Sequence, residues 1–387
     1  MTETEGIVIV GGGHAGAQLC IGLAQAGLEA RVHLVCEEER LPYQRPPLSK
    51  AYLKNPGELL QEHRGANWFL DHAITVHHDA VTEINRNAKT ATLRSGAALR
   101  YAQLVLATGT RARHLHSIPA GLNNVAVVRT VRDADRMRVL LAGARQVTVI
   151  GGGFIGLEVA ATARALGRSV TVLEAAPRLL SRSVSAELAD NVLSTHRADG
   201  IDVRVGVSAG HFEVSGDRLE TLTVDGKREP VDLLILGIGS VPEVSLAEAA
   251  GLECANGVLV DACMRTSDPS ILAVGDCTSF PAHPFAQHAG DRLRLESVQN
   301  ANDQARAATA TLQGREEPYR ALPWFWSEQG SMRLQMAGLM PAQGAQRFRR
   351  PGANDGSFSI LHYVDGGMRC VESVNAPLDH VIARKLL

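Results

Sequence analysis

The chain has 387 residues, of which 45% are hydrophobic, so it is long enough for two or three domains, each with its own core. Its formal net charge is −2, and it has no run of Lys and Arg interleaved with aromatic residues, which argues against nucleic acid as the main partner. No apolar stretch approaches the ~18 residues of a membrane helix, and the acidic start MTETEG leads directly into a predicted strand. We therefore expect a cytoplasmic protein with no membrane partner.

The first predicted unit is a dinucleotide-binding element. Residues 7–10 (IVIV) form an apolar strand that runs into the loop GGGHAG at 11–16 and then into a helix. Such glycines permit a tight turn and a close approach to a pyrophosphate, which is bound at the positive end of the following helix. A second strand over 31–37 ends in Glu37, about 20 positions after the loop, where a carboxylate that binds a ribose diol is expected.

The same pattern occurs a second time. Residues 147–150 (VTVI) lead into GGGFIG at 151–156, and a strand over 170–174 ends in Glu174. Each unit closes with a buried strand and a glycine turn, at 104–109 and at 233–239. One glycine loop is a weak signal, but two complete units predict two bound dinucleotides.

The residues after Glu174 indicate which nicotinamide nucleotide binds. Glu174 is followed by Ala175 and Ala176, so the basic partner of a 2′-phosphate is missing and the carboxylate would repel that group. NAD(H) is therefore favoured over NADP(H), although Arg178 lies close by in the sequence.

Several stretches together carry a family resemblance from residue 7 to about residue 384. They are LPYQRPPLSKAYL (41–53), LVLATGTRAR (104–113), VIGGGFIGLEVAATARALG (149–167), RTSDPSILAVGDC (265–277), RLESVQNANDQARAA (294–308) and PWFWSEQ (323–329). The chain resembles the FAD-dependent ferredoxin reductases that serve bacterial oxygenases and cytochromes P450. These enzymes have the glutathione reductase-like fold, to which apoptosis-inducing factor is also related.

The resemblance implies an α/β protein with two Rossmann-like dinucleotide-binding domains, three-layered, and a C-terminal α+β domain. FAD would bind residues 1–113 and 243–320, NADH residues 114–242, and residues 321–387 would form the C-terminal domain. The NAD-binding domain is expected to be inserted, because the FAD-site residue Asp276 lies beyond it in the chain.

Matching the family position by position gives an expected FAD site. Gly11, Gly13, Ala15 and Gly16 would bind the pyrophosphate, Glu37 and Glu38 the adenosine ribose, and Asp276 the ribityl chain. The helix that opens at Ser297 would point its positive end at the flavin. The full expected set is Gly11, Gly13, His14, Ala15, Gly16, Glu37, Glu38, Arg45, Pro47, Lys50, Val81, Ala107, Thr108, Gly109, Arg113, Gly275, Asp276, Ser297, Val298 and Trp326.

The resemblance also implies an NADH site and three residues at the reaction centre. Hydride transfer needs the nicotinamide held against the flavin rather than an acid or base. In the family Lys50 pairs with Glu158 beside the flavin, and Trp326 is an aromatic residue at the flavin, with a core position as the alternative interpretation. Trp324 is expected in the core. The expected NADH set is Gly151, Gly153, Phe154, Ile155, Gly156, Glu158, Glu174, Ile238 and Gly239.

The cysteines indicate where the electrons go. Related dithiol reductases use two cysteines in the first helix, and peroxidases and oxidases use one near Lys50. Here Cys20 has no nearby partner, residues 43–50 contain no thiol, and Cys36 is expected to be structural. The electrons must therefore leave the protein, and a [2Fe–2S] ferredoxin is the expected acceptor.

The partner is expected to be acidic, because residues 331–387 hold seven basic and four acidic side chains, with a cluster at Arg347, Arg349 and Arg350. A solvated basic loop is the alternative. We expect a monomer or homodimer and no metal site, with His283 and His288 interpreted as ordinary loop residues.

Three positions depart from the family pattern: Ala112, Glu243 and Gly330 stand where proline, asparagine and an aromatic residue are usual. The chain also ends about one helix earlier than typical members, so we expect a more open C-terminal rim. Two other functions stay open, an NADH oxidase or quinone/dye reductase and a redox-responsive interaction protein like apoptosis-inducing factor.

Overall fold

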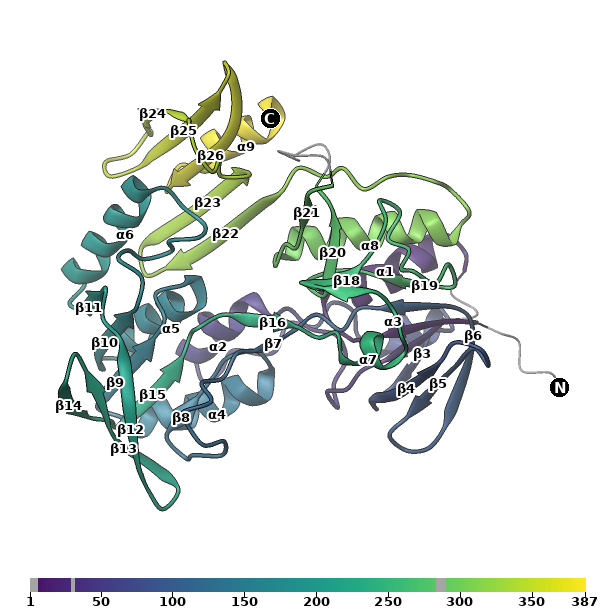
Figure 1. Cartoon of the computed structure of the whole chain (residues 1–387), viewed down its shortest axis with the longest axis horizontal. Coiled ribbons are helices and arrows are strands. Elements are labelled where there is room, and N and C mark those ends of the chain that lie inside the picture. The colour runs from purple at the N-terminus through teal and green to yellow at the C-terminus, as the bar shows by residue number, and fades with distance from the viewer. Residues whose placement is uncertain (1–5, 29–31, 283–289) are drawn as a thin grey trace. The chain divides into compact units, whose positions relative to one another are not determined.

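A computed structural model describes residues 6–28, 32–282 and 290–387 of the chain. These residues form two compact units, each built from three segments (Figure 1). Unit 1 takes its residues from Met1–Gln44, Leu60–Arg111 and Pro242–Pro323, and unit 2 consists of Arg45–Leu59, Ala112–Val241 and Trp324–Leu387.

Unit 1 is built on a parallel sheet with an antiparallel extension. The parallel strands run in the order β3 (Thr75–His77), β2 (Val32–Val35), β1 (Gly6–Val10), β6 (Ala98–Leu106) and β19 (Ile271–Ala273). β5 (Thr90–Leu93) pairs antiparallel with the start of β6, and β4 (Val81–Asn85) pairs antiparallel with β5. β1 and the end of β6 are continuous apolar runs because helices cover central parallel strands, and Ile9 and Leu104 are fully buried.

Helices α1 (His14–Gln25) and α8 (Val298–Leu312) pack against each other in unit 1. The contact is close, since a side chain at Gly22 would overlap Thr309. The remaining elements of this unit are α3 (Ala66–Asp71), α7 (Ser245–Ala249) and a four-stranded sheet of β17 (Cys254–Ala255), β18 (Gly257–Leu259), β20 (Thr278–Pro281) and β21 (Arg292–Leu293).

Unit 2 contains a second parallel sheet. Its strands run in the order β11 (Asp202–Val205), β10 (Ser169–Glu174), β9 (Gln146–Ile150), β15 (Leu233–Leu236) and β8 (Val125–Ala126). Its helices are α2 (Ala51–Lys54), α4 (Val131–Gly143), α5 (Phe154–Ala165) and α6 (Ala186–Ala198), with the 3₁₀ helix η2 (Pro46–Ser49). A separate three-stranded antiparallel sheet consists of β12 (Ala209–Ser215), β13 (Arg218–Val224) and β14 (Lys227–Pro230).

The C-terminal part of unit 2 is a five-stranded antiparallel sheet with one helix. The order is β22 (Trp324–Gln329), β23 (Met332–Gly338), β26 (Gly367–Val374), β25 (Phe358–Val364) and β24 (Gln346–Pro351), and α9 (Pro377–Leu386) packs on β23 and β26. The edge strand β22 contacts α5. Two short strands, β7 (Thr110–Ala112) and β16 (Ser240–Pro242), pair where the chain passes between the units.

The predicted fold class is confirmed, since in each parallel sheet the strand that runs into the glycine loop, β1 or β9, lies between the strand that follows it, β2 or β10, and a strand from later in the chain, β6 or β15. This order places a ligand-binding edge at the carboxyl ends of the central strands. The strand predicted over 31–37 is shorter, Val32–Val35, and residue 31 lies outside the described residues.

One grouping differs from the predicted domain boundaries. Arg45–Leu59 was expected in the first FAD-binding part, but the structure groups it with unit 2 because η2 and α2 pack on α4 and α5. Within the described ranges no helix is long and apolar enough to cross a membrane. His283 and His288 lie outside those ranges, and elsewhere no cluster of three or more metal-ligating side chains is found.

Candidate functional site

The loop after β1 has the geometry of a pyrophosphate cradle. Gly11 adopts φ +119°, and a side-chain carbon there would lie 2.3 Å from the carbonyl oxygen of Ala107, so this position requires glycine. At Gly13 an added carbon would meet nothing within 4 Å. Gly13 caps α1 without any side-chain hydrogen bond, so the helix begins without a side-chain cap.

The loop after β9 in unit 2 repeats this arrangement. A carbon added to Gly151 would lie 2.4 Å from the carbonyl oxygen of Gly237, whereas at Gly153 the nearest atom is 3.8 Å away. α5 also begins without a side-chain cap. Both loops therefore fit a dinucleotide pyrophosphate, with a packed first glycine and an open middle glycine.

The two predicted ribose acids differ in how firmly they are held. Glu37 is exposed and pairs with Arg94 at 3.1 Å. The Glu174 carboxylate accepts hydrogen bonds from the backbone N–H groups of Gly152, at 2.6 Å, and Ala176, at 2.7 Å. Glu174 is thus fixed beside the second loop.

Arg178 is engaged within its own loop. Its guanidinium donates to the carbonyl oxygens of Ser181 and Val184, both at 2.7 Å. This arginine therefore already has partners other than a 2′-phosphate.

The other expected FAD-site residues of unit 1 gather at the carboxyl ends of its strands. Ala107, Thr108 and Gly109 follow β6, and Gly275 and Asp276 follow β19. Since β1, β6 and β19 are parallel, these turns share one edge of the sheet with the Gly11 loop. The turns are held by hydrogen bonds from Thr108 Oγ1 to Glu243 O, at 2.6 Å, and from Gly275 N to Gln304 Oε1, at 2.7 Å.

The remaining unit 1 residues are placed as follows. Ser297 caps α8, with its Oγ accepting from Asn300 N at 3.0 Å, so Val298 is the first helical residue. Glu38 accepts a hydrogen bond from the Tyr43 hydroxyl at 2.5 Å. Val81 begins β4 and is buried.

In unit 2 the predicted pair of Lys50 and Glu158 is present. Lys50 Nζ lies 2.7 Å from Glu158 Oε2, and the Glu158 side chain is only 3% exposed, against 19% for Lys50. Lys50 directly follows η2, in which two prolines fix the backbone φ angles of the first two residues. Glu158 lies on α5.

Sequence reasoning missed two further partners of this carboxylate. The hydroxyl of Ser49 donates to Glu158 Oε2 at 2.5 Å, and that of Ser327 donates to Oε1 at 2.6 Å. The sequence carried no signal for either serine; only the burial of the Glu158 carboxylate requires such donors.

β22 presents its two faces to different neighbours. Trp324 and Trp326 stack on one face with ring centroids 5.6 Å apart, and both are partly exposed. The prediction that Trp324 belongs to the core was therefore wrong. It packs instead between Trp326, His380 and the guanidinium of Arg384, on the surface beside α9. On the opposite face Phe325 meets Phe154 edge-on at 4.5 Å.

Four other expected site residues, Arg45, Arg113, Ile155 and Gly239, also belong to unit 2. Arg45 Nη1 donates to Arg129 O at 2.8 Å, and Arg113 N donates to Gly239 O at 3.0 Å. Ile155, on the first turn of α5, is 48% exposed, as a ligand-facing residue can be. The expected site residues thus form two groups, one in each unit.

All six cysteines are free thiols. Burial raises the pKa of the Cys20 thiol far above its usual range and that of Cys36 to about 12. Low reactivity follows, since the thiolate is the reactive form.

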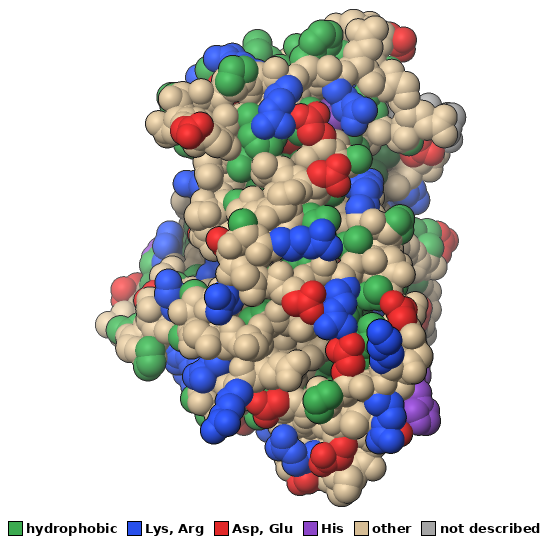
Figure 2. Space-filling view, turned by 90° about the vertical axis from the view of Figure 1, so that its left-hand side faces the viewer, with side chains coloured by type: hydrophobic (Ala, Val, Ile, Leu, Met, Phe, Trp, Pro, Cys, Tyr) green, Lys and Arg blue, Asp and Glu red, His purple; other side chains and the backbone are tan. Residues whose placement is uncertain are grey.

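The basic cluster on β24 is partly neutralised. Arg349 pairs with Glu187 at 2.8 Å and Arg350 with Asp379 at 3.6 Å, while Phe348, which precedes Arg349, is exposed. On the face shown in Figure 2, basic and acidic side chains are interspersed rather than gathered into one basic field.

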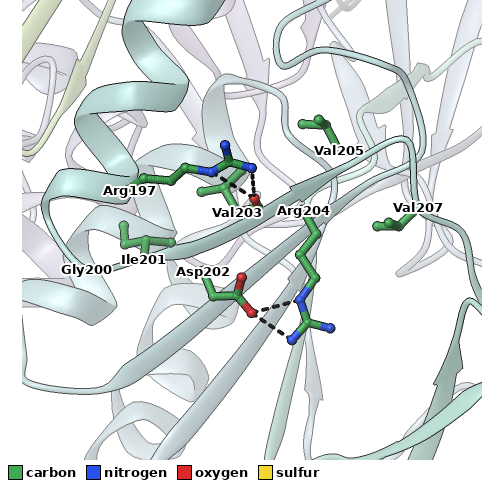
Figure 3. Close-up of a pocket in the computed structure, with 8 residues that line it drawn as sticks. All are labelled: Arg197, Gly200, Ile201, Asp202, Val203, Arg204, Val205 and Val207. Atoms are coloured by element: carbon green, nitrogen blue, oxygen red, sulfur yellow. Dashed lines mark hydrogen bonds and ion pairs between the residues drawn. The ribbon is translucent and has the colours of Figure 1, made fainter.

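A shallow pocket of about 650 Å³ lies along β11 and contains none of the predicted site residues (Figure 3). Its two arginines have partners: Arg197 donates to Val203 O, and Arg204 pairs with Asp202 and Glu229. Its cations are therefore already engaged within the protein.

Known proteins share this organisation. Residues 5–305 match the family model described as pyridine nucleotide-disulphide oxidoreductase, and residues 324–387 match the one described as reductase C-terminal. Rhodocoxin reductase of Rhodococcus erythropolis is 41% identical over 384 residues, covering 98% of this chain and 89% of that protein. Putidaredoxin reductase of Pseudomonas putida is 38% identical over 397 residues, covering 100% and 92%.

Solved structures agree. The ferredoxin reductase of the CYP199A2 system from Rhodopseudomonas palustris superposes with a TM-score of 0.94 at 43% identity, covering 99% of this chain and 94% of that one. Putidaredoxin reductase in its covalent complex with putidaredoxin gives 0.91 at 37% identity, covering 99% and 92%. With two matching pyrophosphate loops, an ordered Glu174 and similarity along its whole length, the chain belongs to the pyridine nucleotide-disulphide oxidoreductase family, whose members use FAD and NAD(H).

Proposed function

We propose that this protein passes electrons from NADH through FAD to a [2Fe–2S] ferredoxin that supplies a cytochrome P450 or a Rieske-type oxygenase. The observation that carries the proposal is the combination of two pyrophosphate loops with six free cysteines, five of them buried. Such a chain can bind both nucleotides but has no disulfide to receive the electrons. The similarity to rhodocoxin reductase and to a putidaredoxin reductase solved with its putidaredoxin supports a ferredoxin as the acceptor.

The proposed division of labour follows the chain. FAD would bind residues 1–113 and 243–320, NADH residues 114–242, and residues 321–387 would form the C-terminal domain. FAD, when bound, supplies the chemistry of accepting a hydride and releasing two electrons singly. The protein's own residues would bind and orient both nucleotides and keep water away from them, and Lys50, Glu158 and Trp326 would be the residues closest to the reaction centre.

Glu174 would select NADH. Its carboxylate is fixed by two backbone N–H groups beside the second loop, where it can accept both hydroxyls of the adenosine ribose and repel a 2′-phosphate. We expect Glu174→Ala to lower the ratio of kcat/KM for NADH to that for NADPH by about tenfold, the loss of one charged hydrogen-bond acceptor. An unchanged ratio would remove Glu174 from the proposed site.

We further propose that the protein acts in the cytoplasm, as a monomer or homodimer. The described helices include none that could span a membrane, and thiols without disulfides fit a reducing compartment.

The test is anaerobic stopped-flow reduction of the purified flavoprotein by NADH, followed by cytochrome c reduction with and without an added [2Fe–2S] ferredoxin. Strong stimulation by ferredoxin is expected. Rapid flavin reduction with oxygen or quinone consumption and no ferredoxin effect would instead identify an NADH oxidase or quinone/dye reductase. Slow turnover with a long-lived complex of reduced protein and NAD would indicate a redox-responsive interaction protein.

A further inference from the structure

A buried row of hydrogen bonds runs from α6 through β22 to α5. The imidazole Nε2 of His196 lies 2.9 Å from Gln329 Oε1, Gln329 Nε2 lies 3.2 Å from Ser327 Oγ, and Ser327 Oγ lies 2.6 Å from Glu158 Oε1. His196, Gln329 and Ser327 are fully buried, and Glu158 is nearly so.

The donors in this row all point the same way. A carboxylate only accepts, so the Ser327 hydroxyl must donate to Glu158, and its oxygen is then free to accept from the Gln329 amide. The amide carbonyl in turn accepts from His196, whose proton is therefore on Nε2. Burial lowers the pKa of His196, which keeps the imidazole neutral, and its Nδ1 has no partner among the described residues.

The row completes the surroundings of Glu158. Lys50 and Ser49 donate to Oε2, so Ser327 is the donor that holds Oε1. Two bonded oxygens fix the plane of the carboxylate, whereas one bonded oxygen leaves it able to rotate.

Strand geometry explains how β22 can do this. Alternate residues of a strand face the same side, and here Phe325, Ser327 and Gln329 meet Phe154, Glu158 and His196 respectively. β22 therefore contacts α5 through Phe325 and Ser327 and α6 through Gln329.

We propose that Ser327, held by Gln329 and His196, is a positioning residue that fixes the Glu158 carboxylate against Lys50. The proposal rests on the proposed function, since Lys50 acts at the flavin only if FAD binds as in the family. It makes the C-terminal domain a contributor to flavin reduction as well as to the surface of the protein. Ser327 acts through Glu158 and is not itself a catalytic residue.

The test compares Ser327→Ala with Ser327→Thr and with a matched control, Ser359→Ala. Ser359 is an equally buried serine of the same sheet, hydrogen-bonded to Ser373 and Asp379 and remote in sequence from the Glu158 row. Three quantities are measured on the FAD-loaded proteins: the limiting rate of flavin reduction with the NADH dissociation constant, the flavin midpoint potential, and Tm.

Ser327→Ala is expected to lower the limiting reduction rate about tenfold, the effect of one hydrogen bond to a charged group, with less than about a twofold change in NADH dissociation constant. The midpoint potential should shift as well. Ser327→Thr restores the hydroxyl and should return both quantities to near the parent values. Ser359→Ala should lower Tm alone.

The proposal is overturned if Ser327→Ala matches Ser359→Ala in rate and potential, because Ser327 would then serve stability only. Should Ser327→Ala fail to fold, Gln329→Met removes the donor to Ser327 and is expected to slow reduction about threefold, a fraction of one hydrogen bond; an unchanged rate in that variant would equally overturn the proposal. These readouts involve no ferredoxin. A parent protein that NADH reduces but ferredoxin does not oxidise would contradict the proposed function and leave the Ser327 result intact.

Discussion

For the pair of Lys50 and Glu158 we predict that a second substitution restores part of the stability lost with the first. The prediction is tested with Lys50→Met, Glu158→Gln and the double variant. Lys50→Met leaves a carboxylate that is 3% exposed with only two hydroxyl donors, which is expected to cost about 3–5 kcal/mol of unfolding free energy. Glu158→Gln leaves an ammonium that is 19% exposed and still donates to Pro46 O at 3.1 Å, so about 1–2 kcal/mol is expected.

The double variant should be more stable than Lys50→Met alone. It carries no buried unpaired charge, so its loss should also be about 1–2 kcal/mol, and the second substitution recovers roughly 2–3 kcal/mol. For a unit of this size that difference corresponds to roughly 5–10 °C in Tm.

Tryptophan fluorescence during urea unfolding can follow unit 2 by itself. The chain has three tryptophans, of which Trp68 lies in unit 1 and Trp324 and Trp326 lie in unit 2. In a Trp68→Phe background the signal reports unit 2, and the same excess of FAD in every sample equalises the stabilisation by ligand. A double variant no more stable than Lys50→Met, or a Glu158→Gln variant less stable than Lys50→Met, would refute the reasoning.

Three further predictions follow from other parts of the molecule. Gly153→Ala should keep Tm and FAD content but weaken NADH binding about tenfold in an equilibrium titration, because the added methyl has room in the fold and obstructs only the pyrophosphate; unchanged binding would contradict this role. Burial, together with the nearby Arg384 and Arg333, lowers the pKa of His380 to about 4. The unfolded chain binds a proton at this histidine below about pH 6.5 while the folded protein does not, so the contribution of His380 to stability is complete above about pH 6.5 and is lost as the pH falls toward 4. About 2 kcal/mol should be lost at about pH 5, and unfolding curves of His380→Phe should lack this component; equal pH profiles for parent and variant would refute it. The KM for ferredoxin should rise with ionic strength, and Arg347→Gln should raise it more than Arg349→Gln, since Arg349 already pairs with Glu187; a salt-independent rate would support a solvated basic loop.

Local features could be predicted well because their causes are local. A packed first glycine, an open middle glycine and an uncapped helix start are properties of a few consecutive residues, so the motif at 151–156 predicts its own geometry. The acid at Glu174 follows from strand length in the same way. The backbone N–H groups of Gly152 and Ala176 that bind its carboxylate come from the loop before α5 and from the turn directly after β10.

Residues without a motif could not be assigned. Trp324 and Trp326 look alike in the sequence, and their common exposure became clear only from the packing of α9 against β22's sheet. Arg178 appeared able to bind a phosphate, but its loop turns it onto backbone carbonyl groups.

The sequence by itself determined the two dinucleotide loops, their acids, the Lys50 motif and the lack of a redox thiol pair, because each depends on residue type and short spacing. Only the tertiary structure decided which side chains surround Glu158. Ser327 lies 169 residues from it, and His196 lies 133 residues from Gln329. Such partners depend on which strand face packs against which helix, and that outcome is set by burial over the whole unit rather than by any local pattern.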